Sequence, residues 1–134
     1  MSADSSWELQ QAIFTALTGD TPLMAMITGV HDHVPQDAAF PYVTIGESTA
    51  RDWSAVGVSG IETTLVMHVW SRERGHKEVK QVLAEIHRIL HDADLTVPSH
   101  VLVWLRFGFS QSIRDNDGAT YHGIAQYDAL TNQA

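Results

Sequence analysis

Histidine is the residue type whose abundance most suggests chemistry in this sequence, with eight copies among 134 residues. His87 and His91 stand four residues apart, which would place both rings on one face of a helix. His31 and His33 stand two residues apart, which would place both rings on one face of a strand. Either pair supplies two ligands, whereas zinc sites use three or four protein ligands. We therefore favour half-exposed imidazoles beside an apolar stripe over a metal site, and we expect no metal.

Two loops resemble catalytic or ligand-binding motifs but lack a required part. Ser59 has Gly57 two residues before it, but Gly60 follows one residue too early for a nucleophile elbow, and a strand is expected next instead of a helix. This loop also has no lysine to hold a phosphate. Residues 115–118, Asp-Asn-Asp-Gly, resemble the start of a calcium loop, but the alternating apolar residues on both sides favour a hairpin turn.

The chain contains no cysteine, so thiol catalysis, thiolate metal sites and disulfide bonds are all excluded. With no complete constellation of nucleophile, base or phosphate loop, we expect no catalytic residue, no cofactor and no enzyme activity. No apolar run approaches the ~20 residues of a membrane span, and the first eight residues lack the pattern of a signal peptide. We therefore expect a soluble protein made inside the cell, without a membrane partner.

Hydrophobic periodicity predicts the elements that position these residues. The chain is expected to begin with a helix between Ser5 and Gly19, with Trp7 packed at its start, and a second helical turn from Pro22. Strands are expected next over 30–34 and 42–47, then a mobile loop over 51–60 and a strand over 61–71. A long helix over 76–93 and a hairpin of strands 101–112 and 119–131 are expected to follow. The predicted fold class is α+β, a mainly antiparallel sheet with a long helix and a short N-terminal helix packed on one face. Residues 1–134 are expected to form a single domain.

Alternation along the strands predicts which side chains reach the core. In strand 101–112 the predicted inner face consists of Val101, Val103, Leu105, Phe107 and Phe109. The alternate positions include Leu102 and Trp104, and the strand over 61–71 adds Val66 and Trp70 to the same outer face. That face would be more apolar than solvent normally permits, so we expect another subunit to cover it.

The charge is divided unevenly along the chain. Eight Lys and Arg against sixteen Asp and Glu give a net charge of −8, which argues against nucleic acid or an anionic membrane as a partner for the whole surface. Residues 1–70 carry −7, with Arg51 as their one base, and residues 71–134 carry −1. The one basic cluster comprises Arg72, Arg74, Lys77 and Lys80. A head-to-tail interface between identical chains could pair this cluster with the acidic half, because such an interface joins two different surfaces.

Trp53 is the residue of the loop over 51–60 that we single out as a candidate contact. A tryptophan among small polar residues is either a plug for the core or an anchor for a partner, and the sequence favours neither. Together with its neighbours Arg51 and Asp52 and the basic cluster, Trp53 makes up the candidate subunit or partner interface.

Several short runs in a fixed order resemble one known family. In chain order they are His-Asp-His-Val-Pro at 31–35, Ala-Ala at 38–39, Pro-Tyr-Val-Thr-Ile-Gly at 41–46, Trp53, and His-Val-Trp-Ser-Arg at 68–72 before a helix. This order resembles the tail-terminator or tail-completion proteins, which join head and tail in long-tailed phages and gene transfer agents. The likeness spans nearly the whole chain, and its most specific pieces, 41–46 and 69–72, are not catalytic.

The resemblance implies a small α+β subunit of a virion or gene-transfer-agent particle, made in the bacterial cytoplasm. It implies a hexameric ring at the head-proximal end of the tail tube that ends tube polymerisation and docks to the stopper protein of the head connector. DNA would pass through the channel without sequence-specific binding, and an acidic channel lining would let it slide. The motifs leave open a phage or a gene transfer agent, a contractile or non-contractile tail, and which face meets tube or stopper.

Two other functions remain open from the sequence. A small histidine-based metal enzyme would use His31 or His87 with a carboxylate. A monomeric adaptor domain would bind a peptide along one edge of the sheet.

Overall fold

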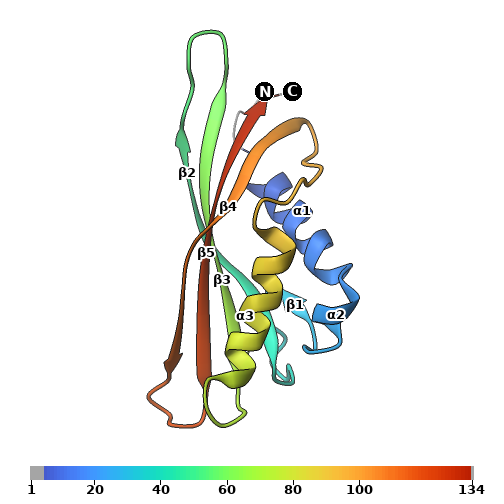
Figure 1. Ribbon diagram of the computed structural model, residues 1–134, viewed down its shortest axis with the longest axis vertical. Coiled ribbons are helices and arrows are strands. Elements are labelled where there is room, and N and C mark those ends of the chain that lie inside the picture. The colour runs from blue at the N-terminus through green and yellow to red at the C-terminus, as the bar shows by residue number, and fades with distance from the viewer. Residues whose placement is uncertain (1–4, 134) are drawn as a thin grey trace.

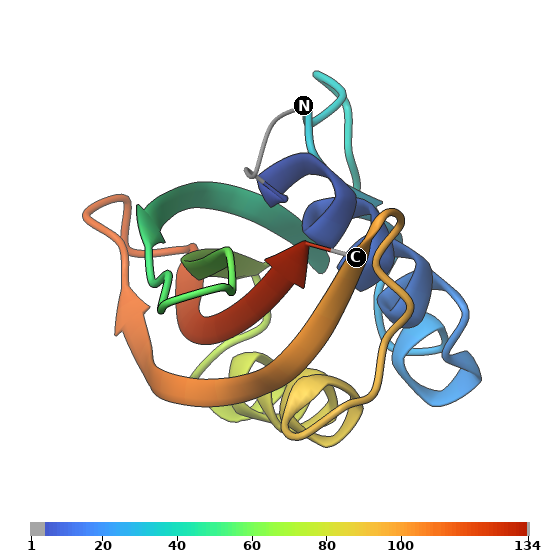
Figure 2. The same cartoon turned by 90° about the horizontal axis from the view of Figure 1, so that it is seen from above.

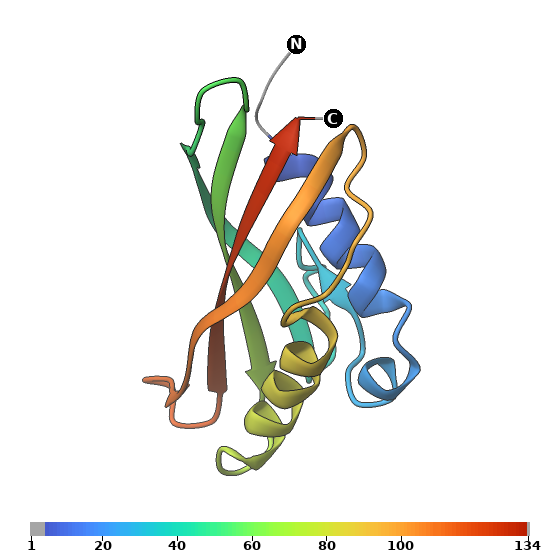
Figure 3. The same cartoon turned by 45° about the horizontal axis from the view of Figure 1, so that its top comes forward.

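The computed structural model describes residues 5–133 and shows a five-stranded sheet with three helices on one side (Figure 1). The elements are α1 (Ser6–Thr18), α2 (Thr21–Met24), β1 (Val30–His31), β2 (Tyr42–Asp52), β3 (Gly60–Ser71), α3 (Lys77–Leu90), β4 (His100–Arg114) and β5 (Tyr121–Gln133). The strand order is β1-β2-β3-β5-β4. Figure 3 shows the two long hairpins, β2 with β3 and β4 with β5, turning at opposite ends of the molecule.

The predicted α+β class is correct, and two details of the prediction change. The sheet is mixed, because β1 pairs parallel to β2 while the other three pairings are antiparallel. The N-terminal helix is not short beside the long one, since α1 has 13 residues and α3 has 14. A strand predicted over 30–34 ends at His31, and β2 runs on to Asp52, so the loop of the first hairpin is 53–59.

The core lies between the sheet and the helices, where the predicted periodicities meet. Alternate residues of β3 from Thr63 to Ser71 are buried, as a strand with one covered face requires. The stripe of α3 that packs on β3, β4 and β5 is fully buried and consists of Val79, Val82, Ile86 and Leu90. Each such side chain contributes about 1.5–3 kcal/mol through burial, so this stripe fixes α3 on the sheet.

Strand β4 departs from the predicted alternation at two β-bulges. Its register with β5 shifts between Leu102 and Trp104 and again between Phe107 and Phe109. Each extra residue moves the following side chains to the other face of the sheet. Leu105 is buried and Phe107 packs against the core, as predicted.

Three members of the predicted inner face of β4 are therefore wrong. The exposed fractions are 52% for Val101, 47% for Val103 and 45% for Phe109. The two bulges leave these three side chains exposed. The predicted alternation would have required an uninterrupted hydrogen-bonded ladder between β4 and β5.

The start of α1 also differs from the prediction. Trp7 does not pack at the helix start, since its side chain is 58% exposed. Ser5 is the N-cap residue but makes no side-chain capping bond. Its hydroxyl instead lies 2.6 Å from the hydroxyl of Thr131, which ties the start of α1 to the end of β5.

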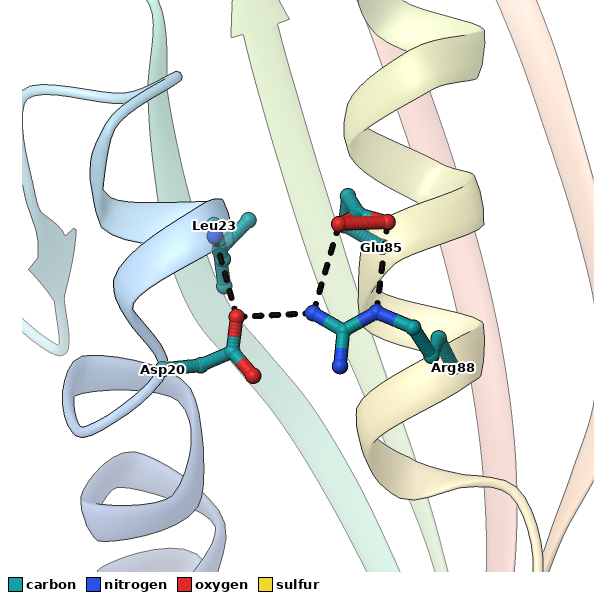
Figure 4. Close-up of polar contacts among 4 residues, drawn as sticks. All are labelled: Asp20, Leu23, Glu85 and Arg88. Atoms are coloured by element: carbon teal, nitrogen blue, oxygen red, sulfur yellow. Dashed lines mark hydrogen bonds and ion pairs between the residues drawn. The ribbon is translucent and has the colours of Figure 1, made fainter.

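An ion-pair network holds the short helix α2 against α3 (Figure 4). The Asp20 carboxylate accepts a hydrogen bond from the Leu23 amide at 3.0 Å and caps α2. The same oxygen accepts from Arg88 Nη2 at 2.7 Å, and Arg88 also donates to Glu85. The hydrogen bond from Arg88 lowers the pKa of Asp20 below its ordinary value, so this carboxylate stays charged in mildly acidic solution.

Candidate interaction surfaces

The predicted interface residues fall into two separate groups. Arg51 and Asp52 end β2 and Trp53 begins the hairpin loop, at one end of the molecule (Figure 1). The basic cluster lies where β3 ends and α3 begins, at the other end. Because β3 has 12 residues and a strand rises roughly 3.3 Å per residue, the two groups are separated by most of the length of the sheet. They form two surfaces and not one site.

The hairpin tip, residues 53–59, presents apolar side chains to solvent. The Trp53 side chain is 57% exposed, Val58 is exposed, and Val56 is fully exposed. The loop is ordered by its own backbone, since the Trp53 amide donates to the Gly60 carbonyl at 2.8 Å and the Ser54 hydroxyl donates to Asp52. Trp53 is therefore not a core plug, and its role as a contact anchor stays a prediction.

The cations of the basic cluster differ in what they contact. The Arg72 guanidinium lies 4.4 Å from the centre of the Phe40 ring and donates to the Thr120 hydroxyl at 3.3 Å, so Arg72 links three parts of its own chain. The Arg74, Lys77 and Lys80 side chains are exposed and form no ion pair within residues 5–133. These three cations are therefore free to bind another molecule.

Two glutamates lie beside these cations. The Glu78 carboxylate accepts from the Ser71 hydroxyl at 2.6 Å and is held in place. Its hydrogen bond and negative charge raise the pKa of Glu73, a rise that the charge of Lys77 opposes. The four cations still outnumber the two carboxylates, so the start of α3 remains a positive surface.

A row of aromatic and polar rings crosses the outer face of the sheet, and sequence reasoning missed it. Trp70 on β3 is paired with His122 on β5, and their rings stack with centres 3.9 Å apart. His122 Nε2 lies 2.6 Å from His68 Nδ1, and His68 Nε2 lies 3.0 Å from Glu47. The positions of these residues on their own strands were visible in the sequence, but the contact depends on the β3–β5 register.

Acidification from pH 8 to pH 5 is expected to lower the free energy of unfolding through His122. Burial and the neighbouring His68 lower the pKa of His122 below its ordinary 6.5, although Asp115 and Glu47 oppose this. The unfolded chain therefore takes up the proton first, and the stability present above pH 6.5 is lost as the pH falls through the lower folded pKa. Urea unfolding at pH 8 and at pH 5 measures this difference in the free energy of unfolding. The His122→Gln substitution should make the difference smaller, and an unchanged difference would contradict the assignment to His122.

The rest of the outer face is apolar only in part. Leu102, predicted to lie there, packs against the core instead, because the first bulge separates it from Trp104. Thr64, Gln126 and Asp128 also lie among the apolar residues of this face. Val66, Trp104, Ile124 and Leu130 are only half-buried there, and Phe109 is exposed. All three helices contact one another on the opposite side, so no described helix covers this face. Its burial by another subunit stays a prediction.

The two histidine pairs differ. His87 and His91 pack locally, whereas β1 ends at His31, so the exposed His33 does not share a strand face with His31, contrary to the prediction. The rings of His87 and His91 stack with centres 4.8 Å apart, and His91 Nδ1 accepts a hydrogen bond from the Phe107 amide at 3.1 Å. The His31 ring lies edge-on to Tyr42. Within residues 5–133 no group of three or more His, Asp or Glu side chains is arranged to hold a metal ion.

Residues 115–118 form the predicted hairpin turn. The Gly118 amide donates to the Asp115 carbonyl at 3.0 Å, and Gly118 has a φ of 71°, which suits glycine. The Asp117 carboxylate accepts from the Ala119 and Thr120 amides and from the Thr120 hydroxyl, which lowers the pKa of Asp117 to about 2. This carboxylate stabilises the turn through its own backbone and needs no calcium.

These features define a structural protein that acts through its surfaces: separate charged and apolar patches surround a helix-backed sheet. The chain belongs to the family of tail completion protein gp17, whose model matches residues 11–132. The tail completion protein gp17 of Bacillus phage SPP1 is 28% identical over 120 residues, which cover 90% of this chain and 89% of that protein. The family resemblance predicted from the sequence is thereby confirmed.

Two solved structures are also similar. A chain in the virion of a native gene transfer agent particle has a TM-score of 0.89 and 25% identity, covering 98% of this chain and 99% of that one. The structure of the bacteriophage SPP1 gp17 protein has a TM-score of 0.63 and 26% identity, covering 93% and 89%.

The chain is accordingly a structural virion protein and not an enzyme, as the sequence predicted. The predicted location, at the head-tail junction of a phage or gene-transfer-agent particle, agrees with these relatives. Among the described residues no helix is long and apolar enough to cross a membrane.

Proposed function

We propose that this tail-completion protein forms a ring, a hexamer by family resemblance, on the head-proximal end of the tail tube. The ring ends tube polymerisation and binds the stopper protein of the head connector, leaving a channel for DNA. The observation that carries this proposal is that one domain has several different exposed surfaces: the basic start of α3, the apolar outer face of the sheet and the hairpin tip at residues 53–59. A closed ring needs such surfaces, because each copy must meet its two neighbours through different patches.

The apolar outer face and the hairpin tip supply further contact area. Partner-binding surfaces commonly have an apolar centre within a polar rim, and Trp and Tyr are enriched in them. The half-buried Trp70 and Trp104 and the exposed Trp53 fit that composition. The ring is thus supported by both charge and apolar surface.

The channel lining is proposed to be net acidic. Residues 1–70 carry −7, and a negative lining repels DNA phosphates so that the duplex is not held. A ring structure in which Arg72, Arg74, Lys77 and Lys80 line the channel would contradict this part of the proposal.

Electron microscopy of the protein mixed with its tail tube tests the proposed function. We expect six-fold rings on one end of each tube and shorter tubes when the protein is present during polymerisation. The same amount of the Asp94→Lys protein, altered at an exposed loop position, is the matched control and should cap tubes equally well. Binding along the whole length of the tubes, without preference for an end, would overturn the proposal.

A further inference from the structure

A shallow pocket lies beside β1, at the edge of the sheet. It has a volume of about 300 Å³, and its lining consists of Asp32, Val34, Tyr42, Thr44, Ile45, Gly46 and Trp70. The pocket exists because β1 ends at His31, so the next part of β2 has no strand on that side among the described residues. Apolar walls and an exposed carboxylate therefore meet at a place where the sheet is open.

Among residues 5–133 Asp32 has no compensating partner. It is exposed and makes no hydrogen bond or ion pair within residues 5–133. No lysine or arginine precedes Arg51 in the sequence, and Arg72, the cation that approaches this segment at Phe40, is bonded to Thr120. The pocket is thus acidic as well as apolar.

This combination matches the chemistry of a lysine side chain. Lysine buries its aliphatic stem along apolar surface while its ammonium group seeks an anion. The apolar wall residues would contact the stem, and Asp32 would accept from the ammonium group. The ligand expected in this pocket is therefore a primary ammonium on an aliphatic chain.

The start of α3 carries two such side chains. Lys77 and Lys80 are three residues apart, so they lie on one face of α3, and both are exposed. Cations at the N-terminal end of a helix are unfavourable in the helix dipole, so Lys77 and Lys80 do not stabilise the isolated helix there. Glu73 lies near Lys77 in the same chain, but neither lysine forms an ion pair within residues 5–133, so both can contact an anion of another copy.

The pocket and these lysines lie on opposite sides of the molecule. Helix α3 packs over β3, β4 and β5, whereas β1 is the far edge of the sheet. Figure 2 shows α3 (yellow) on one side and the segment around 31–41 (cyan) on the other. Within residues 5–133 neither lysine pairs with Asp32, so both can enter the pocket of a neighbouring copy related by rotation.

We propose that, in the ring described above, the lysines at the start of α3 of one copy enter the pocket of the next copy and bind Asp32. This inference rests on the proposed function and assigns the contact that closes the ring. The occupant of the pocket is a second copy of this chain, and the complementary charges select the head-to-tail arrangement.

Two charge-reversed proteins test the contact. Lys77→Glu with Lys80→Glu makes both surfaces acidic, and Asp32→Lys makes both basic. Each protein alone should cap tail tubes at least tenfold less often than the unaltered protein, while its thermal unfolding is unchanged. An equimolar mixture should restore capping, because the two proteins can alternate around an even-numbered ring with opposite charges at every contact.

The outcomes separate this contact from the ring itself. Capping by each reversed protein alone at the normal level would overturn the lysine contact and leave the ring standing. A mixture that fails to cap, with both proteins folded, would also overturn it. Failure of the unaltered protein to cap tube ends would overturn the proposed function, and the contact with it. If a reversed protein unfolds, Asp32→Asn replaces it and should still lower capping, because the neutral amide cannot pair with the ammonium group.

Discussion

The Tyr127→Ala protein is expected to be less stable than the natural protein by about 4 kcal/mol, the cost typical of removing a large buried aromatic side chain. Tyr127 is fully buried at the centre of β5 and contacts the Phe107 ring edge-on. Strand β5 is paired on both sides, with β3 and with β4, so the sheet cannot close over the cavity. Urea unfolding followed by circular dichroism measures the loss. A loss below about 1 kcal/mol would show that the core collapses around the site.

Tyr127→Phe is the matched control, and it should be at least as stable as the natural protein at pH 7. The Tyr127 hydroxyl is buried and has no hydrogen-bond partner among residues 5–133, so its removal relieves a desolvated polar group. Burial also raises the pKa of Tyr127 above its ordinary 10. The folded state therefore resists deprotonation, and stability present below pH 10 is lost as the pH rises above it. Tyr127→Phe should weaken this alkaline loss.

The Gly123→Ala protein is expected to lose about 2–3 kcal/mol of stability, at the upper end of what overpacking usually costs. A Cβ atom at Gly123 would lie 2.6 Å from Val79 Cγ1 and 3.3 Å from Val69 Cβ. Val79 belongs to the buried stripe of α3, so either its side chain or the helix that carries it must shift to admit one methyl group. The midpoint of urea unfolding measures this loss.

Val79→Ala provides the control for the Gly123 prediction, because it removes the atom nearest to the new methyl group. The double variant should be more stable than the sum of the two single losses predicts, by about 1 kcal/mol or more. Strict additivity would show that the strain at Gly123 does not arise from Val79.

The parts of the fold that follow from local chemistry could be predicted from the sequence. Strand β3 alternates from Thr63 to Ser71, α3 carries one continuous apolar stripe, and the Asp-Asn-Asp-Gly run forms the second hairpin turn. Each of these signals lies within one segment and does not depend on how segments pair. Hydrophobic periodicity therefore predicted the strand and the helix, and the turn residues predicted the hairpin.

The bulges of β4 could not be predicted in the same way. Residues 101–105 are all apolar, so the sequence is compatible with either face pointing inward at several positions. Only the ladder with β5 decides that Leu105 is buried while Val103 is exposed.

The candidate site was predictable in its charges but not in its geometry. The excess of acids before Arg51 and the cations from Arg72 to Lys80 are visible in the sequence. The pocket at Asp32 depends on where β1 ends, and the contact of Trp70 with His122 depends on register. Both are set by tertiary structure, so no spacing rule could have revealed them.

The two bulges have a consequence for the unassembled subunit. Strand β4 is the long free edge of the sheet, and such an edge can recruit the strands of other copies into open-ended fibres. Extra residues at Val103 and Gly108 interrupt its row of hydrogen-bonding groups, which makes continuous pairing with a second edge unfavourable. The two bulges therefore disfavour edge-to-edge pairing between unassembled copies.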